Sequence, residues 1–233
     1  MPVHDFIVIG LGTAGSATCM TLARRGFRVL GIDKHRPPHA MGSHHGASRS
    51  VRRAYLEGTA YVPMALKSWE LWQKLERDSG QDLLVETGNL TIGPPDSPAV
   101  TGFMASAKTY DIPHAVLNAS EVRRKWPQLA LPNSFVAGLE KTAGIVFPEL
   151  CIKAFLDEAE KAGADLAFDE PVHRWSEEQG HVRVHTACSA YESGRVLISA
   201  GAWTKGLLDL PGHALQPKRV PVHWITVPKD PSL

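Results

Sequence analysis

A glycine-rich turn between a short apolar run and a helical segment constrains the fold of this chain more than any other feature. Residues 6–9 are apolar and rich in β-branched side chains, as in a buried parallel strand, and the turn that follows contains Gly10, Gly12 and Gly15. In such a turn the first glycine permits a sharp exit from the strand, the second leaves room for a phosphate, and the third lets helix and strand pack closely. The spacing predicts a βαβ unit that binds a dinucleotide at the N-terminus of its helix.

The next predicted strand, residues 28–33, ends in an acidic residue that completes this pattern. Asp33 lies about 20 residues beyond the glycines, where a carboxylate accepts hydrogen bonds from the ribose of an adenosine. Its charge would repel a 2′-phosphate, so FAD or NAD is favoured over NADP. The motif does not choose between FAD and NAD, and a glycine motif alone also occurs in ordinary structural turns.

The composition argues against several other classes of protein. The 233 residues carry 25 basic and 24 acidic side chains, a formal charge of +1, so no overall field would attract nucleic acid or an anionic membrane. No segment reads as a bilayer span or a signal peptide, which predicts a cytoplasmic protein. The cysteines, Cys19, Cys151 and Cys188, lack CxxC spacing and predict neither a disulfide framework nor a zinc site.

Helical and strand patterns continue along the chain. Residues 61–78 and 148–163 have apolar side chains at helical spacing, with a proline near the start and a glycine at the end. Further strands are expected at residues 88–93, 164–168, 182–184, 195–200 and 220–226. Pro94, Pro95 and Pro98 indicate a loop after the first of these. Because the chain stops directly after the last one, we expect it to be the N-terminal part of a longer protein.

The loop between Asp33 and the first long helix concentrates residues that can bind anions or metals. Arg49 and Arg52 are three residues apart and on a helical turn would share one face, from which they could address one anion. A metal site is the alternative, because the loop also holds His35, His39, His44 and His45. No carboxylate lies among these histidines, and two prolines interrupt the one pair at helical spacing, so we expect no metal here.

This loop, together with elements further along the chain, resembles a known family. It contains Pro-Pro-His at 37–39, Gly-Ser-His-His-Gly at 42–46, Ser-Arg at 48–49 and Ala-Tyr-x-Glu-Gly at 54–58. Later elements are Tyr61-Val62-Pro63, Arg124-Lys125-Trp126-Pro127, Gly144-Ile145-Val146-Phe147, Gly201-Ala202-Trp203 and Gln216-Pro217. On these residues, which cover nearly the whole chain, the sequence is similar to the monomeric sarcosine oxidase and N-methyl-L-tryptophan oxidase family of FAD-dependent amine oxidases.

The resemblance implies an α/β fold with a glutathione-reductase-like, FAD-binding Rossmann domain and an interrupted α+β substrate domain that is C-terminally incomplete. The FAD-binding domain would comprise residues 1–85 and 142–213, and the substrate domain residues 86–141 and 214–233. The resemblance also favours FAD over NAD, and it implies a protein that is a monomer when full length.

The activity implied by the resemblance is the oxidation of an N-methyl amino acid, sarcosine or N-methyl-L-tryptophan, by molecular oxygen. Its products would be the demethylated amino acid, formaldehyde and hydrogen peroxide. A related flavin amine dehydrogenase, a D-amino-acid oxidase and a non-catalytic FAD-binding fragment are the alternatives.

Site residues follow from the resemblance by position. Arg49 would lie against the flavin, Arg52 would bind the substrate carboxylate, and His45 would be near the flavin. The other cofactor-binding positions implied are Gly10, Gly12, Gly15, Asp33, Gly42, Ser43, His44, Val172, Gly201 and Trp203. The chain departs from its relatives at 47–48 and at Arg53, which predicts different hydrogen bonding near the flavin. The family's flavin-tethering cysteine and oxygen-activating lysine would lie beyond residue 233.

Overall fold

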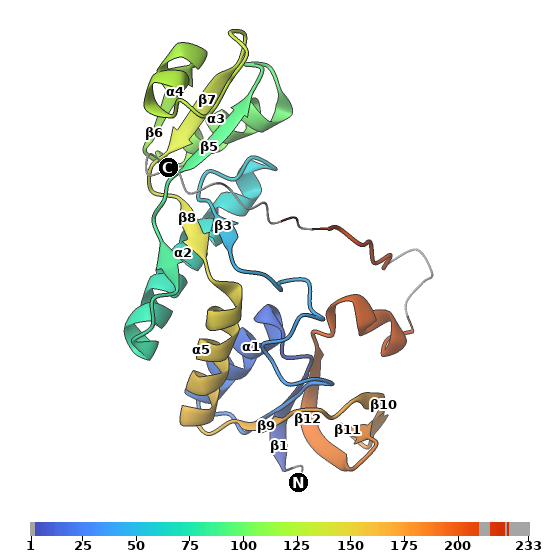
Figure 1. Cartoon of the computed structure of the whole chain (residues 1–233). Coiled ribbons are helices and arrows are strands. Elements are labelled where there is room, and N and C mark those ends of the chain that lie inside the picture. The colour runs from blue at the N-terminus through green and yellow to red at the C-terminus, as the bar shows by residue number, and fades with distance from the viewer. Residues whose placement is uncertain (1–2, 210–214, 222, 224–233) are drawn as a thin grey trace.

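The computed structural model describes residues 3–209, 215–221 and 223, and within them the strands form one large and two small sheets (Figure 1). The large sheet has the order β10-β11-β12-β1-β2-β9. Its strands are β1 (His4–Ile9), β2 (Val29–Ile32), β9 (Asp165–Ala167), β10 (Val172–Glu178), β11 (His181–Thr186) and β12 (Ala190–Ile198). The neighbours β12, β1, β2 and β9 are parallel, whereas β10, β11 and β12 form an antiparallel meander. The predicted α/β class is confirmed.

The central strands β1 and β2 are largely buried on both faces, which explains the continuous apolar run of β1. Two helices, α1 (Thr13–Arg24) and α5 (Pro148–Lys161), pack on one face (Figure 1). Val8, Cys19 and Leu156 belong to the core between them and the sheet. On the other face Ile7 and Ile9 belong to a core with Val184 of the meander. The sheet is therefore enclosed by helices on one face and largely by its own meander on the other.

The middle of the chain builds the two small antiparallel sheets. One has the order β3-β8-β4 and lies beside helix α2; its elements are β3 (Arg49–Val51), α2 (Val62–Ser79), β4 (Leu84–Val85) and β8 (Gly144–Val146). The other, β5-β7-β6, carries two helices; its elements are β5 (Asn89–Gly93), α3 (Pro98–Thr109), β6 (His114–Asn118), α4 (Ala119–Lys125) and β7 (Val136–Glu140). Phe103 of α3 is fully buried on Gly138, where an added Cβ would lie 2.3 Å from its ring. Two 3-10 helices complete the described elements, η1 (Thr59–Tyr61) and η2 (Gly201–Gly206).

Three predictions about local structure need correction. Arg49 begins a strand that pairs with β8 rather than a helical turn, so it and Arg52 do not share a helical face. Pro98 is the first residue of helix α3, capped by the Ser97 hydroxyl, rather than part of a loop. The strand predicted at 195–200 begins earlier, at Ala190, because the meander extends it. The strand predicted at 220–226 lies outside the described residues, apart from 220, 221 and 223.

None of the helices in the described part of the chain is long and apolar enough to cross a bilayer.

Candidate functional site

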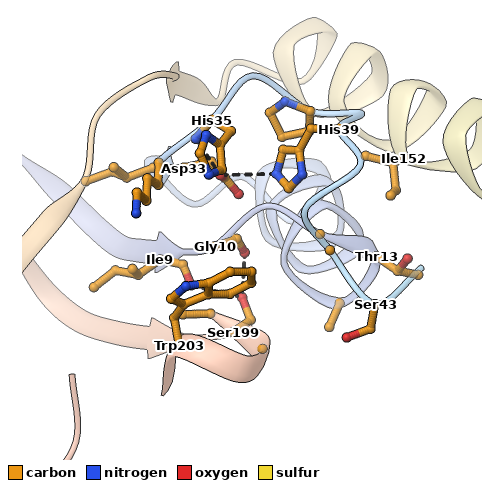
Figure 2. Close-up of a pocket in the computed structure, with 18 of the residues that line it drawn as sticks. Ile9, Gly10, Thr13, Asp33, His35, His39, Ser43, Ile152, Ser199 and Trp203 are labelled. Carbon is orange, nitrogen blue, oxygen red and sulfur yellow. Dashed lines mark hydrogen bonds and ion pairs between the residues drawn. The ribbon is translucent and has the colours of Figure 1, made fainter. Parts of the chain in front are cut away.

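A cavity of about 600 Å³ lies where β1, β2 and β12 reach their carboxyl ends (Figure 2). The turn after β1, the end of β2, the loop at 34–45 and the start of α5 form part of its wall. Residues 170–173 and 199–207 contribute the rest. Carboxyl ends of adjacent parallel strands are where open α/β sheets bind their ligands.

The three glycines of the first turn have different tasks. Gly10 has a φ of +90°, and an added Cβ at Gly15 would lie 1.8 Å from the carbonyl oxygen of Gly10. These two glycines are therefore required by the protein's own backbone. An added Cβ at Gly12 would meet nothing within 4 Å, and Gly12 lines the cavity. The absence of a side chain at Gly12 therefore leaves room for a ligand in the cavity.

The N-terminus of α1 faces the cavity with its polar groups unused. Gly12 is the N-cap, no side chain in the described part of the chain caps the helix, and its first turn holds no acidic residue. The Thr13 hydroxyl is buried and has no hydrogen-bond partner within the described residues. Unpaired backbone N–H groups, the positive end of the helix dipole and a free hydroxyl together suit a phosphate group.

Asp33 follows β2 and is only 7% exposed. One carboxylate oxygen accepts a hydrogen bond from Leu11 N at 2.6 Å, and the other accepts one from His35 N at 2.9 Å. His39 Nε2 lies 3.5 Å from the second oxygen. A dashed line in Figure 2 marks this contact. Each oxygen keeps a further lone pair, so the carboxylate can also accept from ribose hydroxyls in the cavity.

A second carboxylate shapes the wall at residues 170–173. Glu170 accepts hydrogen bonds from Thr186 Oγ1 at 2.6 Å and from the Tyr191 hydroxyl at 3.0 Å. Burial, with a smaller contribution from the Glu170 carboxylate, raises the pKa of the Tyr191 hydroxyl. The meander thereby holds the segment that includes Val172 against the cavity.

The loop at 42–46 contributes Gly42, Ser43, His44 and His45 to the wall. His45 Nδ1 lies 3.0 Å from Glu149 Oε1, in the first turn of α5. Burial, and then the charge of Arg49, lowers the pKa of the His44 imidazole. Among the described residues, no three His, Cys, Asp or Glu side chains are grouped so that they could hold a metal ion.

Arg49 and Arg52 are not among the residues that line the cavity. The Arg49 guanidinium donates to the carbonyl oxygens of Ser48 and His45, at 2.8 and 2.6 Å. Arg52 Nη2 donates to Glu57 Oε1 at 3.2 Å, with its guanidinium over the Tyr55 ring. Arg49 is thus joined to the cavity wall through His45, whereas Arg52 is held by the Glu57 carboxylate.

The structure brings all the predicted cofactor-binding residues into the cavity wall except Gly15 and Arg49. Gly15 acts beneath the wall, through its contact with Gly10. Sequence reasoning missed the lining residues Thr13, Lys34, His35, His39, Glu149, Ile152, Glu170, Ser199 and Leu207. Positions 34–35 and 199 could have been found from the rule that ligands bind at the carboxyl ends of parallel strands.

Comparisons with known proteins identify the family of this chain. The model of the FAD dependent oxidoreductase family (DAO) matches residues 5–232. Monomeric sarcosine oxidase of Streptomyces avermitilis is 44% identical over 96% of this chain and 58% of its own length. N-methyl-L-tryptophan oxidase of Yersinia pestis is 36% identical over 95% of this chain and 59% of its own. The chain therefore spans somewhat more than half the length of these relatives.

A solved structure of NikD, described as an unusual amino acid oxidase essential for nikkomycin biosynthesis, superimposes with a TM-score of 0.80 and 28% identity. The match covers 88% of this chain and 53% of NikD. Glycine oxidase from Geobacillus kaustophilus shares the fold, with a TM-score of 0.75 at 23% identity. The family match decides the choice between FAD and NAD in favour of FAD. Because it extends over nearly every residue, the chain belongs to the FAD-dependent oxidoreductase family.

Proposed function

We propose that this chain carries the FAD site of an oxidase that acts on N-methyl amino acids. The observation that carries the proposal is the uncapped N-terminus of α1, where Gly12 opens onto the cavity and the Thr13 hydroxyl is unpartnered within the described residues. This end would hold the diphosphate, and Asp33 the adenosine ribose. The names of the relatives, sarcosine oxidase and N-methyl-L-tryptophan oxidase, support the substrate class.

When bound, FAD would supply acceptance of a hydride from the substrate and transfer of the electrons to oxygen. The net reaction converts an N-methyl amino acid, oxygen and water to the demethylated amino acid, formaldehyde and hydrogen peroxide. Sarcosine and N-methyl-L-tryptophan are both candidate substrates. Peroxide formation distinguishes this oxidase from the related dehydrogenases.

The other residues have proposed roles in the same site. Val172 would lie beside the adenine, and Gly201 and Trp203 would contact the cofactor further along. Gly42, Ser43 and His44 would approach the remainder of FAD, with His45 near the flavin. Arg49 would favour negative charge that develops on the flavin, and Arg52 would exchange Glu57 for the substrate carboxylate.

The arginines provide the test. In the full-length enzyme we expect Arg52→Ala to raise KM for sarcosine by roughly ten- to a hundredfold with flavin content unchanged, because a charge-assisted carboxylate clamp is lost. Arg49→Ala should instead slow flavin reduction in stopped-flow measurements. Arg174→Ala, at an exposed position on β10, is the matched control and should change neither. An Arg52→Ala protein with the parent KM would contradict the proposed clamp.

The location, the oligomeric state and the domain division of the protein are further predictions. The protein would act in the cytoplasm, and it would be a monomer when full length. The chain would divide into FAD-binding segments at 1–85 and 142–213 and substrate-domain segments at 86–141 and 214–233.

A further inference from the structure

Glu140, the last residue of β7, is a fully buried carboxylate that does not line the cavity. Its Oε1 accepts a hydrogen bond from Arg53 N, and its Oε2 accepts one from Ala54 N, both at 3.0 Å. Arg53 Nε lies 3.8 Å from Oε1 and supplies the opposite charge. Burial of a carboxylate is costly unless hydrogen bonds and charge compensate it. Among the described residues, the hydrogen bonds and the ion pair to the Glu140 side chain come from the two residues that follow Arg52.

The Arg53 side chain also holds the backbone at residues 53–54, through contacts with Thr142 and Trp69. Its Nη2 donates to the carbonyl oxygen of Thr142 at 2.6 Å, and its guanidinium lies 4.5 Å from the ring centroid of Trp69. Trp69 is itself buried on α2. Arg53 therefore joins α2 to the turn between β7 and β8, and it does so away from the cavity wall.

Arg52 thus lies between two fixed points of the backbone. On its N-terminal side Val51 pairs with Gly144 of β8, where an added Cβ would lie 2.1 Å from the carbonyl oxygen of Val85. On its C-terminal side the N–H groups of Arg53 and Ala54 are bound to Glu140. Since β3 has only three residues, its own ladder fixes the chain direction weakly. The Glu140 carboxylate, together with the Arg53 side chain, holds the backbone that follows the strand.

We propose that Glu140 is a positioning residue whose buried carboxylate fixes the backbone after β3 and thereby places the Arg52 guanidinium for the substrate carboxylate. This inference rests on the proposed function, because it uses the role of Arg52 as the carboxylate clamp. Glu140 acts through Arg52 and does not itself touch the substrate. A clamp that is displaced by a fraction of an ångström loses much of its binding energy, so a distant carboxylate can control ligand affinity.

A double-mutant cycle in the flavin-loaded protein tests the inference. The probes are methoxyacetate, a carboxylate of the size of sarcosine, and methoxyacetamide, its neutral analogue; binding is measured from the change in flavin absorbance. In Glu140→Gln, the side-chain NH2 group would face one of the two backbone N–H groups and could not accept its hydrogen bond. We therefore expect this variant to raise the Kd of methoxyacetate by roughly tenfold. The Kd of methoxyacetamide and the flavin content should stay at parent values. In an Arg52→Ala background, Glu140→Gln should have no further effect on methoxyacetate.

The outcomes separate this inference from the proposed function. If Arg52→Ala leaves methoxyacetate binding unchanged, the carboxylate clamp itself is wrong. If Arg52→Ala weakens methoxyacetate but Glu140→Gln does not, or if their effects add, only the role of Glu140 is overturned. Equal weakening of both probes would show a merely structural role and overturn it as well. Glu160→Gln, at an exposed position on α5, is the control, and Glu140→Asp replaces Glu140→Gln if the latter does not retain flavin.

Discussion

Asp33 bonds to the protein's own backbone as well as facing the cavity, and a test of its role has to separate the two. We predict that Asp33→Asn weakens FAD binding by roughly ten- to a hundredfold, because charge-assisted hydrogen bonds to the ribose are lost. Asparagine keeps one oxygen for the backbone N–H of Leu11 or His35 but turns its NH2 group toward the other N–H, so the flavin-free protein should also unfold at a lower temperature. FAD titration followed by flavin fluorescence measures the first effect and thermal unfolding the second. An unchanged FAD affinity would remove Asp33 from the site.

Cysteine reactivity follows from burial. Burial raises the pKa of the Cys19 and Cys151 thiols to about 12, so at pH 8 both remain protonated and unreactive in the folded protein. Cys188 is exposed, in the turn between β11 and β12. We therefore expect a maleimide at pH 8 to label Cys188 alone, and all three cysteines after denaturation. Mass spectrometry of the peptides checks this, and rapid labelling of Cys19 in native protein would contradict the packing of α1.

At the residue scale, the site residues that could be predicted from the sequence are those whose role depends on the local geometry of the chain. Gly10 and Gly15 could be predicted because the turn needs them wherever the motif folds, and Asp33 because its position follows from β2. Glu140 and Glu149 could not, because their partners are 86 or more residues away in the chain. Contacts of that kind depend on how the elements pack rather than on any local pattern.

Three helices meet at one arginine near the end of α1. Arg24 donates to Asp78 near the end of α2 and to Glu158 of α5, both at 2.6 Å. Lys74 and Arg24 lower the pKa of the Asp78 carboxyl, and Lys161 and Arg24 lower that of Glu158. These ion pairs link the end of α1 to α2 and to α5.

The pH dependence of this network gives a prediction for the helices. Both carboxyl pKa values are lower in the folded state, so their stabilisation is present above the unfolded values near 4 and is lost as the pH falls through the folded values. We expect Arg24→Met to lower the free energy of unfolding by about 1–2 kcal/mol at pH 7, since the groups are partly exposed. At pH 2.5 the difference from the parent should be much smaller. Urea unfolding at the two pH values measures it, and an equal difference at both would exclude the ion pairs as its cause.

At the scale of elements, strong periodic patterns predicted structure well and weak ones did not. The helix at 148–161 was predicted because proline and glutamate at its start agree with its apolar face. Helix α3 was missed because Pro98 was interpreted as part of a proline loop, although Ser97 before it is a good N-cap. Strand β3 was misjudged because its partner, β8, is almost a hundred residues further on. Short strands take their identity from their neighbours in a sheet rather than from their own residues.

At the scale of the whole molecule, the α/β class and a dinucleotide site were predictable because a βαβ unit with this glycine spacing has few other uses. The choice of FAD over NAD came from the resemblance to the sarcosine oxidase family and not from the glycine motif. The path of the middle segment was not predictable, since two small sheets are built from strands of two to five residues. The cavity itself required three strand ends, a loop and a helix start to be brought together. We propose that FAD binds in this cavity with its diphosphate at the N-terminus of α1.

Two glycine variants test that claim most directly. FAD is titrated into flavin-free parent, Gly12→Ala and Gly15→Ala proteins, and thermal unfolding of each is measured without FAD. Gly15→Ala should unfold at a lower temperature, because its Cβ would lie 1.8 Å from Gly10 O. Gly12→Ala should unfold at the parent temperature, since its Cβ meets nothing within 4 Å, yet bind FAD at least about tenfold more weakly, or about 1.4 kcal/mol. If Gly12→Ala binds FAD as tightly as the parent, the diphosphate does not lie at this turn and the proposed FAD site is wrong.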